Sequence, residues 1–389
     1  MSEKMSTFQK ILLSILSIGI IILCVLVLSS GYKLWQKPLG PALSLPKNTF
    51  APHSELPATW TPDANTTYAP GYSSTGTPPP PTVAPTQITL CGGPPTMTIL
   101  AIGSDQRGDI YNYGLGDVIR LVRVDFVTPR VTIMSFPRDL YVEIPGISDH
   151  YGITHGKINQ AYLYGNTGFG YYDGEDLGPG LMARTLAHNF GAQPDNYIAV
   201  NMQTFVKIVN AVDGVIVDLP KTIDGRPKDQ PNRSDLIFYS GKHRLNGKQA
   251  LQLARLRPEG TFKRTTAQNE VLCALYDRLL SPKVIDNIPE ILASFEDRVQ
   301  TDLSPAQISQ LACLGTKLEG SDIIFYNWSE DIFNGTRIDD PILGHTFILE
   351  TNFALIRDYV DAFSRGYWLG EESSPSTGSD DIAPKSFCD

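Results

Sequence analysis

Three closely spaced β-rich runs constrain the fold of this chain most strongly. They read MTILAIG, DVIRLVRVDF and RVTIMSF, and they begin at Met97, Asp117 and Arg130. The first run is apolar at nearly every position, which is typical of a strand buried on both faces rather than of a sheet edge. We therefore expect a central strand here, whose exit loop carries polar groups to a crevice where open α/β sheets bind ligands.

Charged residues gather at the ends of these three runs. Asp105 and Arg107 follow the first run, Asp117 opens the second, and Arg138 follows the third. Carboxylate oxygens hold hard divalent cations, and guanidinium groups bind phosphate oxygens in pairs. Each residue alone is typical of a surface ion pair. Their clustering favours a site for a cation and a phosphorylated ligand.

Alternating patterns after these runs predict an α/β layer fold. Asp213 and Gly214 mark a turn between a helix and a strand, and Asn246 is a candidate N-cap. The helices are expected at Gly178–Phe190, Thr204–Val212, Leu245–Arg257, Arg264–Leu280, Val284–Phe295, Ser304–Lys317 and Asn352–Phe363, and further strands at Asn196–Met202, Gly214–Pro220 and Asp322–Trp328.

An uncharged, mostly apolar segment at Ile11–Ser30 has the length of a membrane span. No A-x-A-like cleavage site follows it, which favours an uncleaved anchor over a signal peptide. Lysines lie on both sides of the segment, so the positive-inside count does not set its orientation. From the short N-terminus, we expect residues 1–10 in the cytoplasm and the bulk of the chain outside, as a single-pass membrane protein.

Composition divides the rest of the chain into three parts. Residues 31–95 are dense in Pro, Thr and Ser without a hydrophobic period, which predicts a disordered extracytoplasmic stalk. Residues 96–370 are expected to form the folded domain, and residues 371–389 a flexible tail. The formal net charge of -9 argues against nucleic acid as a partner.

Four cysteines beyond the apolar segment fit an oxidising compartment. They allow three pairings. We favour Cys273 with Cys313, on consecutive predicted helices, and Cys91 with Cys388, near the two ends of the domain. Four free thiols are the alternative. The sequence shows neither a C-x-x-C motif nor a pair of histidines that would indicate zinc.

A second cluster of basic residues surrounds the link between two predicted helices. Arg255 and Arg257 end the first helix, and Arg264 and Gln268 share one face of the second. So many guanidiniums around one link repel one another unless an anion lies between them. The motif KINQAY, with Lys157 and Asn159, is by itself more typical of a solvated loop than of a site.

The chain resembles the LytR-CpsA-Psr family. The resemblance rests on the blocks GSDQRGD, GDVIRLVRVD, SFPRDLYVEIPG, KINQAY, VDGVIVDLP and LNGKQALQLARLR, followed by R-x-x-x-Q. These blocks run in order from Thr98 to about Leu280. The resemblance implies a central mixed β-sheet with helices on both faces, preceded by a membrane helix and a disordered stalk.

By the same resemblance, the protein is a bacterial membrane-anchored phosphotransferase. It would move a glycopolymer from a polyprenyl-pyrophosphate carrier to a hydroxyl of peptidoglycan. Asp105 and Asp117 would hold Mg²⁺ or Mn²⁺, with Asp105 also counted as catalytic. The pyrophosphate would be bound by Arg107, Arg138, Lys157, Asn159, Arg255, Arg257, Arg264 and Gln268, of which Arg138, Arg255 and Arg257 are also expected to be catalytic.

Two departures from the family pattern keep other functions open. Thr261 stands where the family often has an acidic residue, and Ala267 stands where an arginine usually precedes the glutamine. A non-catalytic polyprenyl-phosphate-binding protein or regulator, and a pyrophosphatase, are therefore the alternatives. The two retained carboxylates favour an enzyme over a binder.

Overall fold

The computed structural model describes residues 28–45, 88–108, 110–227, 229–256, 261–281, 284, 298–326, 328–340, 342–369, 385–386 and 388, with the backbone alone at 261–266, 330, 385 and 386. Within these residues, seven strands form a central sheet in the order β11-β6-β1-β2-β3-β12-β15. Their bounds are β1 Thr96–Ser104, β2 Gly116–Asp125, β3 Arg130–Phe136, β6 Asn196–Asn201, β11 Val299–Thr301, β12 Ile323–Tyr326 and β15 Lys385–Ser386.

Strand β1 lies inside this sheet, as its apolar sequence predicts. It pairs antiparallel with β2 and parallel with β6. β3 pairs antiparallel with β2 and parallel with β12. The sheet is therefore mixed, as expected from the family resemblance.

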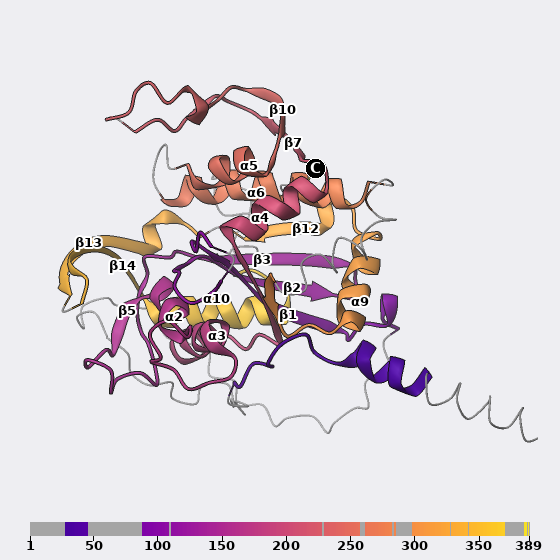
Figure 1. The fold of residues 1–389 in the computed structure, drawn as a ribbon, viewed down its shortest axis with the longest axis horizontal. Coiled ribbons are helices and arrows are strands. Elements are labelled where there is room, and N and C mark those ends of the chain that lie inside the picture. The colour runs from indigo at the N-terminus through magenta and orange to yellow at the C-terminus, as the bar shows by residue number, and fades with distance from the viewer. Residues whose placement is uncertain are drawn as a thin grey trace, which may run out of the picture.

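Helices cover both faces of the sheet (Figure 1). Helices α2, α3 and α10 pack on one face, and α4, α5 and α6 lie over the other. A further helix, α9, packs near the 3₁₀ turn η1 at Leu90–Gly92. The helix bounds are α2 Ile158–Gly165, α3 Leu177–Phe190, α4 Met202–Ala211, α5 Gly247–Arg255, α6 Thr261–Leu279, α9 Pro305–Gly315 and α10 Phe353–Arg365.

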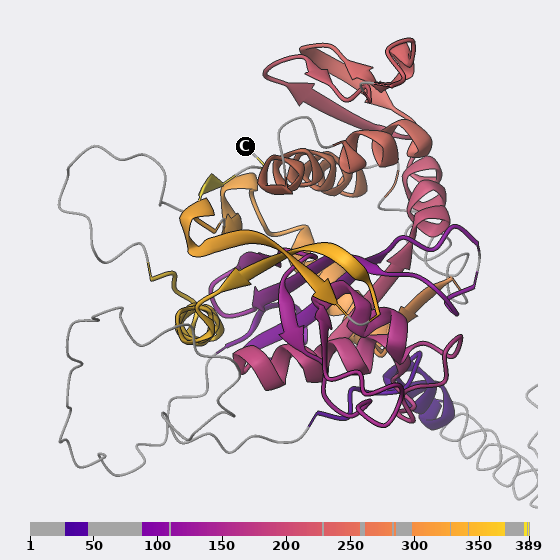
Figure 2. The same ribbon diagram turned by 90° about the vertical axis from the view of Figure 1, so that its left-hand side faces the viewer.

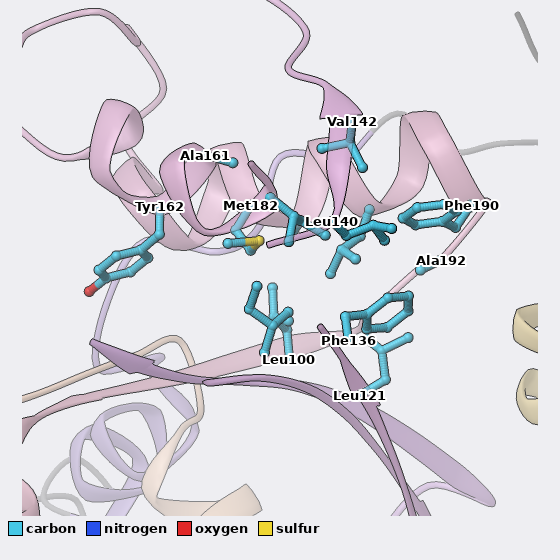
Figure 3. Close-up of a cluster of buried hydrophobic side chains, with 14 of the residues drawn as sticks. Leu100, Leu121, Phe136, Leu140, Val142, Ala161, Tyr162, Met182, Phe190 and Ala192 are labelled. Atoms are coloured by element: carbon cyan, nitrogen blue, oxygen red, sulfur yellow. The ribbon is translucent and has the colours of Figure 1, made fainter. Parts of the chain in front are cut away.

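The main hydrophobic core lies between the sheet and the layer of α2, α3 and α10. Leu100, Leu121 and Phe136 point from three neighbouring strands toward Met182 and Phe190 of α3 (Figure 3). Because side chains alternate along a strand, the residues between these positions face the opposite helix layer. One face of β1 and β2 therefore packs against the layer of α2, α3 and α10, and the other face lines a cavity.

Smaller sheets lie outside this framework. β7 (Val215–Leu219), which the sequence places in the α/β alternation, pairs with β10 (Gly241–Leu245) instead of joining the central sheet. In Figure 2 this pair extends beyond α5 and α6. The remaining short strands pair as β4 (Tyr141–Glu143) with β5 (His155–Lys157), β8 (Ile223–Asp224) with β9 (Ile237–Phe238), and β13 (Phe333–Asp340) with β14 (Gly344–Thr351).

Two local predictions are confirmed. The Asn246 side chain caps α5 by accepting a hydrogen bond from the Gln249 backbone N–H at 3.0 Å. In turn, the Gln249 side chain accepts a hydrogen bond from the Asn246 backbone N–H. Gly214 has φ +79°, in the left-handed region, where a side chain would be strained. Both residues bound the segment that carries β7 and β10.

The predicted membrane anchor lies almost wholly outside the described residues, as does most of the predicted stalk. No helix in the described part of the chain is both long and apolar enough to cross a bilayer. Residues 28–36 are helical, and residues 39–45 lie against the domain, although the stalk was predicted to start at residue 31. Buried carboxylates and core contacts hold residues 39–45, as described below.

The predicted disulfide pairing is wrong. Cys91 is bonded to Cys313, and Cys273 to Cys388. The reason is packing: Cys91 shares a hydrophobic cluster with residues of α9, whereas Cys273 of α6 packs against the β3 and β12 side of the sheet together with Cys388.

The second disulfide also limits the predicted flexible tail. Ser386 pairs with Ile324, and Lys385 with Phe325, so β15 extends the sheet edge beside Cys388. The prediction of a flexible tail therefore does not hold for Lys385, Ser386 and Cys388. Residues 371–384 lie outside the described residues.

Candidate functional site

A cavity of about 610 Å³ lies between the central sheet and helices α4, α5 and α6. Its polar lining residues come mainly from strand ends and from the helix layer, and they are Ser104, Asp105, Asp117, Arg120, Arg138, Asn201, Arg255 and Gln268. The rest of the wall is apolar or small, formed by Ala101, Ile102, Gly103, Val118, Ile198, Val200, Met202, Phe205, Ile208, Leu251, Ala254, Val271, Leu272 and Leu275.

The sheet topology brings three of the predicted site residues to one edge. β1 ends at Ser104, directly before Asp105, and β3 ends at Phe136, two residues before Arg138. β2 runs antiparallel between them and starts at Gly116, which pairs with Ser104. Asp105, Asp117 and Arg138 therefore meet where two strands end and one begins, and all three line the cavity.

Ionic contacts fix the carboxylate of Asp117. Arg138 Nη1 lies 2.5 Å from Asp117 Oδ2, and Asn159 Nδ2 donates to Asp117 Oδ1 at 3.3 Å. On its other side, Arg138 Nε lies 3.4 Å from Asp139 Oδ2, and Lys157 Nζ lies 3.3 Å from Asp139 Oδ1. These contacts position the Arg138 fork in advance, so it loses little freedom when it binds an anion.

Asp105 is held by its own loop. Its backbone N–H donates to the Leu115 carbonyl at 3.0 Å, and its Oδ1 accepts the Leu115 N–H at 2.7 Å. This pair of bonds closes the loop between β1 and β2. The Asp105 carboxylate is therefore fixed at the cavity wall near Asp117.

Arg120 is a site residue that the sequence reasoning missed. Its side chain is buried on β2 and lines the cavity. Arg120 Nη1 donates to Asn269 Oδ1 at 2.8 Å and Nη2 to Gln268 Oε1 at 3.3 Å, while Gln268 Nε2 donates to the Ala254 carbonyl at 3.2 Å. The sequence signal was an arginine between the apolar residues Ile119 and Leu121 of a predicted inner strand, because a buried cation needs partners.

The other predicted site residues differ in whether they line the cavity. Arg255 lines the cavity and is exposed to solvent, at the C-terminal end of α5. Arg107 is exposed and is not part of the described cavity wall. Lys157 and Asn159 lie behind Arg138 and Asp117, and KINQAY belongs to the buried helix α2 rather than to a solvated loop. Arg257 and the Arg264 side chain fall outside the described residues.

Asp105 and Asp117 are the two carboxylates of the cavity wall. Among the described residues, no group of three or more His, Cys, Asp or Glu side chains could hold a metal. Mg²⁺ in phosphoryl-transfer sites commonly uses only one or two carboxylates, with water and substrate phosphates completing its shell. Asn159 Oδ1, whose amide nitrogen contacts Asp117, is buried and accepts no hydrogen bond from any described residue. This amide oxygen is not part of the cavity wall, whereas Asp105 and Asp117 line the cavity and are ligands of the kind that a hard cation prefers.

Known proteins resemble this chain in sequence and in fold. The family described as LytR_cpsA_psr matches residues 90–329. Similar sequences include regulatory protein MsrR of Staphylococcus aureus (strain COL), 29% identical over 68% of this chain and 74% of the relative. Another is polyisoprenyl-teichoic acid–peptidoglycan teichoic acid transferase TagU of Oceanobacillus iheyensis, 32% identical over 64% of this chain and 76% of the relative. The crystal structure of B. subtilis TagV has a similar fold, with a TM-score of 0.52 and 24% identity over 68% of this chain and 96% of that one.

Proposed function

This chain belongs to the LytR-CpsA-Psr family, and from that premise we propose that it is a membrane-anchored transferase. It moves a phosphorylated glycopolymer from a polyprenyl-pyrophosphate carrier to a hydroxyl group of peptidoglycan outside the cell. A single observation carries the proposal: Asp105, Asp117, Arg138 and Arg255 line the same cavity, whose remaining wall is largely apolar. The teichoic acid transferase named among the relatives supports the choice of substrates.

The cavity supplies the electrostatics that this reaction needs. The acceptor oxygen forms a bond to the sugar-linked phosphorus, and the bond from that phosphorus to the bridging oxygen breaks. Polyprenyl phosphate leaves with the electron pair, and the acceptor hydroxyl releases its proton to solvent. Negative charge grows on the phosphate oxygens, and fixed guanidiniums such as Arg138 stabilise that charge more in the transition state than in the ground state.

We propose that Asp105 and Asp117 hold Mg²⁺ or Mn²⁺ together with the substrate phosphates. When bound, the cation supplies Lewis-acid stabilisation of the phosphate oxygens. We expect Asp105→Asn to raise the Mg²⁺ concentration needed for half-maximal transfer, because one negative charge is lost from the site. Transfer measured across a Mg²⁺ titration checks this. An unchanged titration midpoint in the variant would count against a role for Asp105 in holding the metal.

The apolar wall fits the polyprenyl chain of the donor. Leu275 of α6 and Leu251 of α5 line this part of the cavity and are only partly buried. We expect Leu275→Trp to weaken binding of a long polyprenyl donor while a short-chain donor of the same head group binds as before. An equal loss of binding for both donors would indicate that the polyprenyl chain does not bind at this part of the cavity. The short donor is the internal control, since it keeps every phosphate contact.

The decisive experiment uses the purified chain with Mg²⁺, a lipid-pyrophosphate oligosaccharide and peptidoglycan fragments. Mass spectrometry of the products should find a new phosphodiester between the oligosaccharide and the peptidoglycan fragment. Phosphorylated oligosaccharide released only into water would indicate a pyrophosphatase instead. Donor binding without any turnover would indicate a binding protein or regulator.

A further inference from the structure

The segment after the apolar N-terminal run is fastened to the domain. Leu39 N–H donates to the Leu303 carbonyl at 3.2 Å, and Ser44 N–H donates to Asp176 Oδ2 at 2.8 Å. Arg184 Nη2 donates to the Ser44 carbonyl at 2.8 Å. We call residues 39–45 the strap. Its backbone is thus bonded to the domain near both of its ends.

Two buried carboxylates accept hydrogen bonds from backbone N–H groups of the strap. Asp176, at the N-cap of α3, and Asp302, just after β11, are each only 2% exposed. Burial raises the pKa of Asp302, and backbone N–H groups of Tyr197 and Leu43 act in the opposite direction by hydrogen bonding to its carboxylate. A buried carboxylate without donors would be strongly unfavourable. The strap therefore adds hydrogen bonds to two carboxylates that Tyr172 and Tyr197 of the domain also contact.

Side-chain packing completes the contact. Leu43 and Leu45 pack against the main core. At Gly40 the backbone passes so near the sheet that an added Cβ would lie 2.6 Å from the Thr301 carbonyl oxygen. The strap is thus part of the domain, unlike the free stalk that its composition predicts.

The helix before the strap has the opposite character. Leu28, Tyr32, Leu34 and Trp35 are 72%, 66%, 68% and 49% exposed. Leu28 belongs to the end of the apolar segment Ile11–Ser30 and the other three follow it, with Lys33 and Lys37 among and after them. Tyr, Trp and Lys at the end of an apolar segment are typical of the membrane–water interface. Only Pro38 separates Lys37 from the first strap residue.

We propose that the strap holds the domain directly on the membrane surface, with residues 28–37 in the lipid interface. The Pro-rich residues 46–87 then do not separate the domain from the bilayer, since both Leu45 before them and Leu90 after them are bonded or packed to the domain. This inference rests on the membrane anchoring included in the proposed function. The domain is then joined to the membrane by a short, fixed connection instead of a long spacer.

Two matched insertions test this inference in the full chain, inserted in a supported bilayer of phosphatidylglycerol and phosphatidylethanolamine. A flexible Gly/Ser segment of about 20 residues has a root-mean-square length of roughly 25 Å. Placed between Lys37 and Pro38, it should widen the gap between bilayer and protein measured by neutron reflectometry. The same segment placed between Asp63 and Ala64 should leave the gap unchanged.

A free stalk predicts a different result, in which both insertions widen the gap equally, and that result would overturn the inference. A third variant tests the strap itself. Ser44→Pro removes the N–H that Asp176 accepts and should widen the gap, whereas Ser44→Ala keeps the N–H and should not. A chain that does not enter the bilayer at all would instead overturn the anchoring. If the parent chain shows no transfer activity while the gap between bilayer and protein changes in the variants as expected, only the proposed reaction is overturned.

Discussion

Replacing Arg138 by alanine is expected to lower the rate of glycopolymer transfer by about 10²–10³-fold, which corresponds to roughly 3–4 kcal/mol of lost transition-state stabilisation. Arg138 is the guanidinium that lines the cavity while being fixed on both sides, by Asp117 and by Asp139. We expect a similar loss for Arg255→Ala. The measurement is single-turnover transfer with the donor in excess over its dissociation constant.

The fold should survive this change. The side chains of Arg138 and Asp117 are each 20% exposed, so water can reach the carboxylate that loses its partner. Arg138→Lys should recover part of the activity, because it keeps the charge but not the two-pronged geometry. Arg337→Ala, at an exposed position of β13, is the matched control and should transfer at the original rate. Original rates in both Arg138→Ala and Arg255→Ala would refute the assignment of these residues.

Removing the Cys91–Cys313 disulfide is expected to lower the free energy of unfolding by about 2–5 kcal/mol. This bond closes a loop of 222 residues, so it restricts the unfolded chain strongly. It also ties η1, just before β1, to α9 in a shared hydrophobic cluster. The variant Cys91→Ser with Cys313→Ser, followed by chemical denaturation, measures the loss.

Two controls make this result specific. Cys24→Ser changes a cysteine outside both disulfides and should leave the unfolding free energy as it is. Peptide mapping without reductant should recover Cys91 linked to Cys313, and Cys273 linked to Cys388. A peptide joining Cys273 to Cys313 would contradict the pairing described here, as would a double variant that unfolds at the same denaturant concentration as the parent.

Local sequence patterns were sufficient to predict the frame of the site. The apolar run of β1 indicated an internal strand, and the charges at the ends of the three runs indicated one polar crevice, because open α/β sheets bind ligands where strands end. Asp105, Asp117 and Arg138 do line one cavity. Arg120 was not predicted as a site residue, because strand alternation alone does not determine which face of β2 is packed and which one lines a cavity.

Long-range contacts were less accessible to sequence reasoning. Cys313 follows Cys273 on a later helix, but helix order does not determine which side chains meet, and α9 packs toward η1 instead. The strap has the composition of a linker, and what makes it structured is a pair of buried carboxylates, Asp176 and Asp302, far away in the chain. The β13–β14 hairpin was not predicted, because Phe333 and Ile338 are the only large apolar residues of β13 and do not form a period-2 pattern.

The bond between Cys273 and Cys388 also imposes an order of events on biosynthesis. Helix α6 forms a wall of the candidate cavity, and Cys388, the covalent partner of its Cys273, lies 115 residues later in the chain. The ribosome must therefore complete β12, α10 and β15 before this wall can be locked. Until Cys388 has been synthesised and oxidised, this wall of the cavity lacks its covalent link to the edge of the sheet.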